Sequence, residues 1–199
     1  MNWLSIRSAR APAMLAFVVG ALLGSSVLAQ ADTGDRVESY TYNQSEIVET
    51  GHKFFGSVSG GLATVVEKAF SRYGEPNGYI LGEEGSGAIV AGARYGEGQL
   101  YTRNAGQHKL FWQGPSLGWD FGGNGSRVMT LVYNLPSVDA MYNRFIGVNG
   151  SAYLIGGFGM TVLQNHDTIL VPVRAGVGAR LGVNIGYLKF TDKATWNPF

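Results

Sequence analysis

The strongest constraint on the fold is a stretch near the end of the sequence in which glycine and polar residues alternate with apolar ones. Around the predicted strand Val177–Leu188, one face carries Ala175, Val177, Ala179, Leu181, Val183, Ile185 and Tyr187. The other face carries Gly176, Gly178, Arg180, Gly182, Asn184 and Gly186. Interior glycines weaken a strand, so their repetition is tolerated where a sheet bends sharply or where another backbone comes close. The pattern therefore favours a small closed barrel over a flat open sheet.

A period of two extends from Tyr79 almost to the end of the chain, which predicts short strands separated by turns. Of the 199 residues, 30 are glycine, about twice the average share of roughly 7%. The predicted strands are Tyr79–Glu83, Ala88–Tyr95, Gln99–Arg103, Lys109–Gln113, Leu117–Gly122, Ser126–Leu135, Ala152–Leu163, Thr168–Ala175 and Val177–Leu188. The predicted hairpin turns are Gly96-Glu97-Gly98 and Gly123-Asn124-Gly125. About eight or nine such strands fit a small barrel whose interior is filled by side chains.

Helical patterns occur at two places. Over residues 43–76, apolar residues recur every three to four positions, with Asn43 and Glu46 in the spacing of a capping box and Gly74 as a C-terminal stop. Gly51 and Gly56 are expected to divide this stretch into two helices, the second covering about Ser57–Tyr73. A short helix capped by Ser137 is expected after Pro136. The predicted fold is mainly β: a small soluble glycine-rich antiparallel β-barrel with N-terminal helices packed against it.

The first 31 residues have the form of an export signal. Arg7 and Arg10 precede an apolar run of small residues, and Ala29-Gln30-Ala31 matches the pattern that signal peptidase cleaves. The apolar core is shorter than the roughly 20 residues that a membrane span needs. The expected organisation is a signal peptide over 1–31, cleaved after Ala31 or nearby, a polar lead over 32–42, and a single barrel domain over 43–199. No membrane span is expected after the signal is removed.

Charge limits the possible binding partners of the chain, and the lack of cysteine limits how it can be stabilised. The signal removes two of the fifteen basic residues and none of the fourteen acidic ones, which leaves a net charge of −1. The basic residues are scattered singly, so no nucleic-acid-binding patch is expected. The chain has no cysteine, so stability in an oxidising compartment depends on packing alone.

An exported antiparallel chain could also be an outer-membrane β-barrel, and the C-terminal Phe199 at first supports this alternative. A terminal membrane strand needs apolar, lipid-facing residues at every second position before that phenylalanine. Those positions hold Asn197, Thr195, Lys193 and Thr191. The pattern therefore favours the soluble barrel.

Recognisable catalytic chemistry is absent from the sequence. His52, His108 and His166 are far apart, and none has metal-ligand spacing with another ligand, so each is interpreted as an ordinary surface or turn residue. No G-x-S-x-G elbow or phosphate-binding glycine loop occurs. Glu83 and Glu84 are neighbours in a strand and point to opposite faces, so they are interpreted as a solvated edge. No catalytic residue, metal site or cofactor is predicted.

One aromatic cluster, KLFWQGPSLGWDFGG at residues 109–123, supplies the candidate site. Trp112, Trp119 and Asp120 are predicted to line a groove for an apolar or glycan ligand, because aromatic walls with few polar groups are typical of such sites. The alternative is structural: Asp120 forms an ion pair with Arg127 or Arg94 beneath an aromatic core, because an unpaired buried charge is very costly. Both interpretations remain open from sequence alone.

Several motifs along the mature chain resemble the alphaproteobacterial envelope integrity protein A family. They are the helical GSVSGGLATVVEKAF, the strand segments YILGEEGSGAIVAGARYGEGQLY and FWQGPSLGWDFGGNGSRVMTLVYNL, and the closing GARLGVNIGYLKFT. The shorter pieces GAIVAGARYGEG and SLGWDFGG are also similar to a lipid-binding domain family of yeast actin-associated proteins, which favours lipid contact.

The main resemblance implies a soluble periplasmic β-barrel without a catalytic centre that keeps the cell envelope intact under stress. It also implies links to lipopolysaccharide and, in pathogenic members, to virulence. The expected function is non-enzymatic binding of an envelope lipid, a glycan or a periplasmic protein partner. The alternatives are an enzyme that acts on envelope polymers, a scaffold without a small ligand, and the outer-membrane barrel.

Overall fold

The computed structural model describes residues 40–56, 60–87, 91–117, 126–175 and 186–195. These residues contain the helices α1 (Gln44–Phe55) and α2 (Gly60–Tyr73) and the 3₁₀ helix η1 (Val138–Met141). The strands are β1 (Gly78–Gly87), β2 (Ala91–Thr102), β3 (Gly106–Leu117), β4 (Ser126–Tyr133), β5 (Arg144–Gly147), β6 (Tyr153–Ile155), β7 (Phe158–Met160), β8 (Leu163–Asn165), β9 (Thr168–Ala175) and β10 (Tyr187–Thr191).

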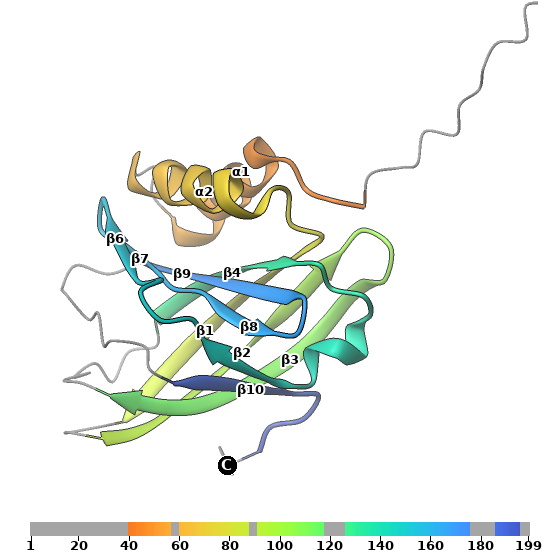
Figure 1. The fold of residues 1–199 in the computed structure, drawn as a ribbon, viewed down its shortest axis with the longest axis vertical. Coiled ribbons are helices and arrows are strands. Elements are labelled where there is room, and N and C mark those ends of the chain that lie inside the picture. The colour runs from red at the N-terminus through yellow and green to blue at the C-terminus, as the bar shows by residue number, and fades with distance from the viewer. Residues whose placement is uncertain (1–39, 57–59, 88–90, 118–125, 176–185, 196–199) are drawn as a thin grey trace, which may run out of the picture. The chain divides into compact units, whose positions relative to one another are not determined.

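Eight of these strands close into an antiparallel barrel, as predicted. Their order is β4-β1-β2-β3-β10-β5-β8-β9, and the additional pairing of β4 with β9 closes the ring (Figure 1). The remaining two strands, β6 and β7, form a hairpin. Strand β7 pairs with the last residues of β9, while β8 pairs with its first residues. One edge of β9 is therefore shared by two short strands.

The helices begin and end at the residues that the sequence marks. The Asn43 side chain accepts from the Glu46 backbone N–H, and the Glu46 side chain accepts from the Asn43 N–H, so the predicted capping box is present. Gly56 ends α1 at a φ of 84°, and Gly74 follows α2 at a φ of 76°. Gly51 does not divide the helices: it lies buried inside α1, where an added Cβ would come within 2.8 Å of Leu62 Cδ2. The expected helix start at Ser57 lies outside the described residues.

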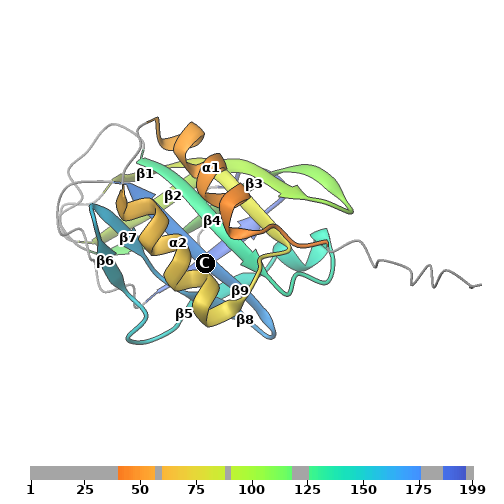
Figure 2. The same cartoon turned by 90° about the horizontal axis from the view of Figure 1, so that it is seen from above.

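Two apolar clusters lie on opposite sides of the barrel wall. The outer cluster joins both helices to the outward faces of β4, β7 and β9, and it includes Ile47, Leu62, Met129, Leu131, Val171 and Val173. Figure 2 shows the helices across these strands. The inner cluster receives a buried side chain from every barrel strand: Ile80, Leu100, Leu110, Trp112, Val132, Phe145, Leu163, Leu170, Leu188 and Phe190. Each large apolar side chain buried in this way contributes about 1.5–3 kcal/mol.

The predicted turn at Gly96-Glu97-Gly98 is wrong, because these residues lie in the middle of β2 and pair on both sides with β1 and β3. The glycines are needed there for another reason. A Cβ on Gly98 would lie 2.5 Å from the Leu81 carbonyl oxygen, so the strands could not approach as closely with a larger residue.

The region after β4 also differs in detail from the sequence prediction. The short 3₁₀ helix η1 lies where a helix was expected, and Ser137 occupies its N-cap position but makes no side-chain capping hydrogen bond. Strand β5 follows it and was not predicted. The predicted strand Ala152–Leu163 is broken, because Gly156 and Gly157 both have positive φ and turn the chain into the β6–β7 hairpin. The predictions for residues 118–125 and 176–185, including the turn at Gly123 and most of the alternating strand, lie outside the described residues.

Among the described helices, none has the length and apolar character that crossing a membrane requires.

Candidate functional site

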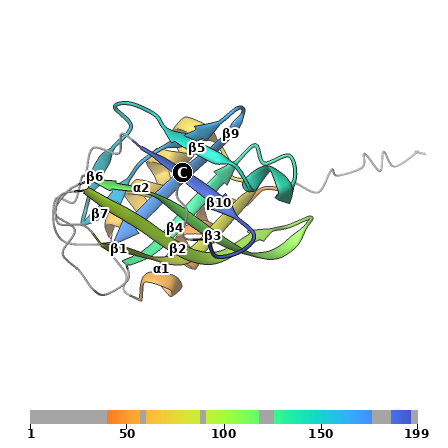
Figure 3. The ribbon, with the colours of Figure 1, turned by 90° about the horizontal axis from the view of Figure 1, so that it is seen from below.

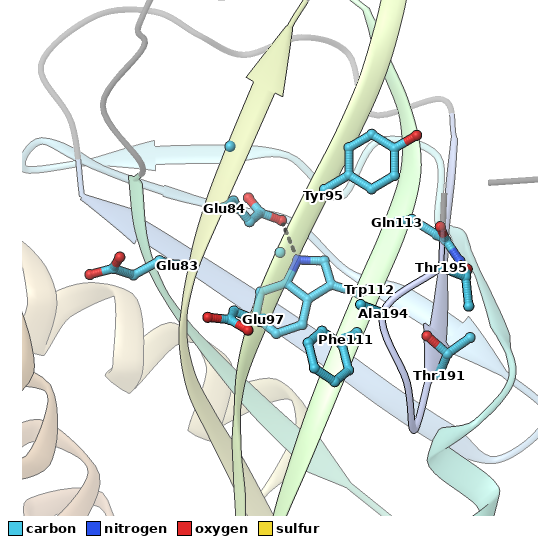
Figure 4. Close-up of a pocket in the computed structure, with 12 residues that line it drawn as sticks. Glu83, Glu84, Tyr95, Glu97, Phe111, Trp112, Gln113, Thr191, Ala194 and Thr195 are labelled. Atoms are coloured by element: carbon cyan, nitrogen blue, oxygen red, sulfur yellow. Dashed lines mark hydrogen bonds between the residues drawn. The ribbon is translucent and has the colours of Figure 1, made fainter. Parts of the chain in front are cut away.

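A groove of about 340 Å³ lies on the outer face of β1, β2 and β3. Its outward-facing lining comes from Glu83 on β1, Tyr95 and Glu97 on β2, and Phe111 and Gln113 on β3. Its remaining side is formed by Thr191 at the end of β10 and by Ala194 and Thr195 in the segment that follows (Figure 4). Seen from below, this C-terminal segment leaves β10 on the side of the barrel away from the helices (Figure 3). The groove is therefore formed by segments far apart in the sequence.

Beneath the groove, on the lumen side, Glu84 is held by an arginine and a tryptophan. Arg174 Nε donates to Glu84 Oε2 over 2.7 Å, and its Nη2 donates to Oε1 over 3.0 Å. Trp112 Nε1 donates to Oε1 over 2.9 Å. The side chain of Glu84 is 7% exposed and that of Arg174 is 22% exposed. A charged group is thus buried with a bidentate partner, the geometry in which such pairs are strongest.

The solvated-edge interpretation of Glu83 and Glu84 is therefore wrong for Glu84. The two residues do point to opposite faces, because Glu83 is exposed while Glu84 is buried. The sequence contained a usable signal: Glu84 has the same parity as Ile80, which faces the lumen. Its partner Arg174 is 90 residues away, and no local pattern links the two.

The pKa of Glu84 reflects two opposing influences. Burial alone raises the pKa of a carboxyl group, and it is the largest single influence here. The charge and hydrogen bonds of Arg174, with smaller contributions from Arg94 and Trp112, act in the opposite direction and prevail. Together they lower the pKa of Glu84 from 4.5 to about 2, so the group is ionised throughout the physiological range.

This shift predicts a loss of stability in acid. Because the pKa of Glu84 is lower in the folded chain than in the unfolded chain, its stabilisation is complete above about pH 4.5 and is lost as the pH falls towards 2. The expected loss from this group is about 3 kcal/mol. Urea unfolding between pH 7 and pH 2 measures it. Glu84→Gln is expected to flatten the pH dependence in that window, and an unchanged slope in this variant would contradict the assignment.

Of the three predicted site residues, Trp112 is the one that lies within the described part of the chain. Trp112 is 4% exposed, lines the groove and packs against Phe190, with ring centroids 5.7 Å apart. Trp119 and Asp120 lie outside the described residues, so the proposed Asp120 ion pair stays a prediction. Of its two suggested partners, Arg127 donates to the Phe54 carbonyl oxygen over 2.9 Å. The role of all three residues in ligand binding also stays a prediction.

Gln113 is a groove residue that was not predicted from the sequence. Its side chain is 2% exposed, and its Nε2 donates to Thr195 Oγ1 of the C-terminal segment. Its Oε1 is buried and has no hydrogen-bond partner. A buried acceptor without a partner costs free energy, and such an atom at a groove is a candidate contact for a ligand.

The three histidines are spread over separate elements. His52 lies in α1 and His108 in β3, where its Nε2 is 2.8 Å from the Ala105 carbonyl oxygen, while His166 lies in a turn at a φ of 49°. Within the described part of the chain, no group of three His, Cys, Asp or Glu side chains is arranged to hold a metal ion.

The ring of eight antiparallel strands, the helix pair across one side and the external groove define a small, mainly-β barrel protein. Within that class, the chain belongs to the envelope integrity protein A family, whose model matches residues 40–199. The resemblance stated from the sequence motifs is thereby confirmed. The family description links the protein to the integrity of the cell envelope.

A solved structure is also similar: a β-barrel-like, uncharacterised protein from Brucella abortus. It is 65% identical in sequence, has a TM-score of 0.75, and the match covers 81% of this chain and 100% of that one. A search of curated proteins found no match.

Proposed function

We propose that this is a non-enzymatic periplasmic protein that supports envelope integrity by binding an envelope component in the groove over β1, β2 and β3. The observation that carries the proposal is the groove itself, in which aromatic walls and a few polar groups converge on one concave surface. Membership of the envelope integrity protein A family supports the envelope as the place of action.

Charged residues on the outer barrel wall support a water-facing barrel over the outer-membrane alternative. Lys109 Nζ and Glu97 Oε2 form an ion pair at 3.1 Å, and both side chains are more than half exposed. Charged side chains on the lipid face of a membrane barrel cost about 2–4 kcal/mol near the bilayer midplane. An exported protein that keeps such a surface is suited to the periplasm, in agreement with the export signal expected over residues 1–31.

The environment of Glu84 supports binding over hydrolysis of envelope polymers. A polymer-cleaving enzyme that uses two carboxyl groups needs one with a raised pKa to donate a proton. The pKa of Glu84 is lowered, and its oxygens are occupied by Arg174 and Trp112. Glu83 points to the opposite face of the strand. These two carboxyl groups are therefore unsuited to act as an acid–base pair.

Filling the groove should abolish the function without unfolding the barrel. Gly85 lines the groove, and a Cβ added there would meet nothing within 4 Å, so Gly85→Trp places an indole ring in the groove without a backbone clash. In a deletion strain of the source bacterium, this variant is expected to fail to restore resistance to detergent and cell-wall stress. Colony survival, with immunoblots for protein level, measures the effect.

The matched control is Gly159→Trp, because Gly159 also lies in a strand and has equally open space for a Cβ, but it is outside the groove. It is expected to restore resistance like the unchanged protein. Full rescue by Gly85→Trp at normal protein level would overturn the proposal that the groove carries the function.

A further inference from the structure

The charge of the groove restricts what it can bind. Among the described residues that line it are three glutamates, Glu83, Glu84 and Glu97, and no lysine, arginine or histidine. A phosphate or carboxylate brought into the groove would meet the exposed carboxylates of Glu83 and Glu97, and none of the described lining residues offers it a positive charge. Anionic lipid headgroups are therefore poorly matched to this surface.

The groove is also a weak site for a cation, because two of the three carboxylates already have partners. Glu84 is held by Arg174 and Trp112 on the lumen side, and Glu97 pairs with Lys109. The exposed carboxylates of Glu83 and Glu97 keep lone pairs that accept hydrogen bonds, and the pairing of Glu97 with Lys109 weakens its attraction for a cation. The surface is suited to a ligand that is rich in hydrogen-bond donors and carries no net charge.

Aromatic rings supply the apolar part of the surface. In the register of β2 and β3, Tyr95 pairs with Gln113 and Glu97 pairs with Phe111, so Tyr95 and Phe111 occupy diagonal positions on one face. Diagonal positions of neighbouring strands are about 7–8 Å apart, within reach of one ligand. Figure 4 shows the two rings towards opposite ends of the groove, with the C-terminal segment beside them.

Gln113 is opposite Tyr95 in the register and two residues along β3 from Phe111, and it gives an independent indication of a ligand. Its buried Oε1 has no partner, while the other end of the same amide contacts Thr195. Thr191 and Thr195 line the same side of the groove. An incoming hydroxyl or amide N–H would satisfy the Gln113 oxygen, and this offsets the cost of leaving it unpaired.

We infer that the groove binds an uncharged glycan, whose hydroxyl groups donate to Gln113, Glu83 and Glu97 and whose apolar ring faces pack on Tyr95 and Phe111. This inference rests on the proposed function, because it names the class of envelope component that the groove takes. Polyhydroxylated rings combine many donors with apolar faces, and the groove offers acceptors beside aromatic rings.

Isothermal titration calorimetry with uncharged tetramers of N-acetylglucosamine, mannose and glucose tests the inference on the protein without its signal. At least one tetramer is expected to bind with a Kd of about 1 mM or tighter. Tyr95→Ala is expected to weaken that binding about tenfold or more, because it removes an aromatic wall. Tyr95→Phe keeps the ring and is expected to stay within about threefold of the unchanged protein.

Tyr101→Ala is the matched control, because Tyr101 lies on the same strand and face but outside the groove. It is expected to bind like the unchanged protein, with thermal unfolding used to verify that each variant is folded. Absence of binding by all three tetramers, or unchanged binding by Tyr95→Ala, would overturn the inference. Binding to phosphatidylglycerol vesicles that Gly85→Trp abolishes would also overturn it, yet would leave the proposed function standing. Full rescue of the deletion strain by Gly85→Trp would overturn both the proposed function and the glycan inference.

Discussion

Arg174→Ala is expected to lower the free energy of unfolding by about 3–5 kcal/mol, because it leaves the Glu84 carboxylate buried without its bidentate partner. The cost arises mainly from the charge that remains and less from the attraction that is lost. A domain of this size has a total stability of about 5–15 kcal/mol. The variant should therefore unfold at a much lower urea concentration, as followed by tryptophan fluorescence.

Lys53→Ala is the control for this prediction. Lys53 and Glu49 form an ion pair on α1, but their side chains are 75% and 68% exposed, so the free energy of unfolding should stay nearly unchanged. The double variant Glu84→Gln, Arg174→Met should recover part of the loss, because it leaves neither charge buried alone. A cost of Arg174→Ala as small as that of Lys53→Ala would show that water reaches the lumen pair.

Gly96→Ala is expected to destabilise the barrel by about 1–3 kcal/mol through overpacking. The indole ring of Trp112 lies against Gly96, and a Cβ at this position would overlap it. The ring cannot move away easily, because its Nε1 donates to Glu84 and it packs against Phe190. Thermal unfolding measures the loss, and near-ultraviolet circular dichroism reports displacement of the indole.

Gly85→Ala separates the overpacking from the general effect of adding a methyl group to a glycine-rich strand. Gly85 lies in the neighbouring strand β1, and its Cβ would meet nothing within 4 Å. This variant is expected to be neutral or slightly more stable, because alanine reduces the entropy of the unfolded chain. Equal effects of the two substitutions would contradict the packing described for Trp112.

The sequence predicted the parts of the fold that depend on neighbouring residues. The capping box at Asn43 and Glu46, the helix end at Gly74 and the strand Thr168–Ala175 all agree with the structure. Gly96-Glu97-Gly98 was mistaken for a turn because two glycines around a charged residue satisfy turn preferences locally. Their actual role depends on contacts with β1 and β3, which no window of a few residues contains.

The groove was predictable to a smaller extent. Trp112 was found because it belongs to a dense aromatic segment, whereas Arg174 and the C-terminal residue Thr195 are brought to the site by barrel closure. Strand parity could have indicated that Glu84 faces inward with Ile80. Parity cannot indicate that β3 lies next to β10, and that adjacency is what brings Gln113 and Thr195 together.

The pairing of β3 with β10 has a consequence for how the chain folds. Residues 111–113 pair with residues 189–191, so the ring cannot close until the last strand is available. Pairings this distant in sequence raise the contact order and slow folding, and the unpaired edge of β3 stays open to other chains in the meantime. A newly made molecule therefore passes through an interval in which protection from aggregation must come from elsewhere, and holdase chaperones are suited to that task.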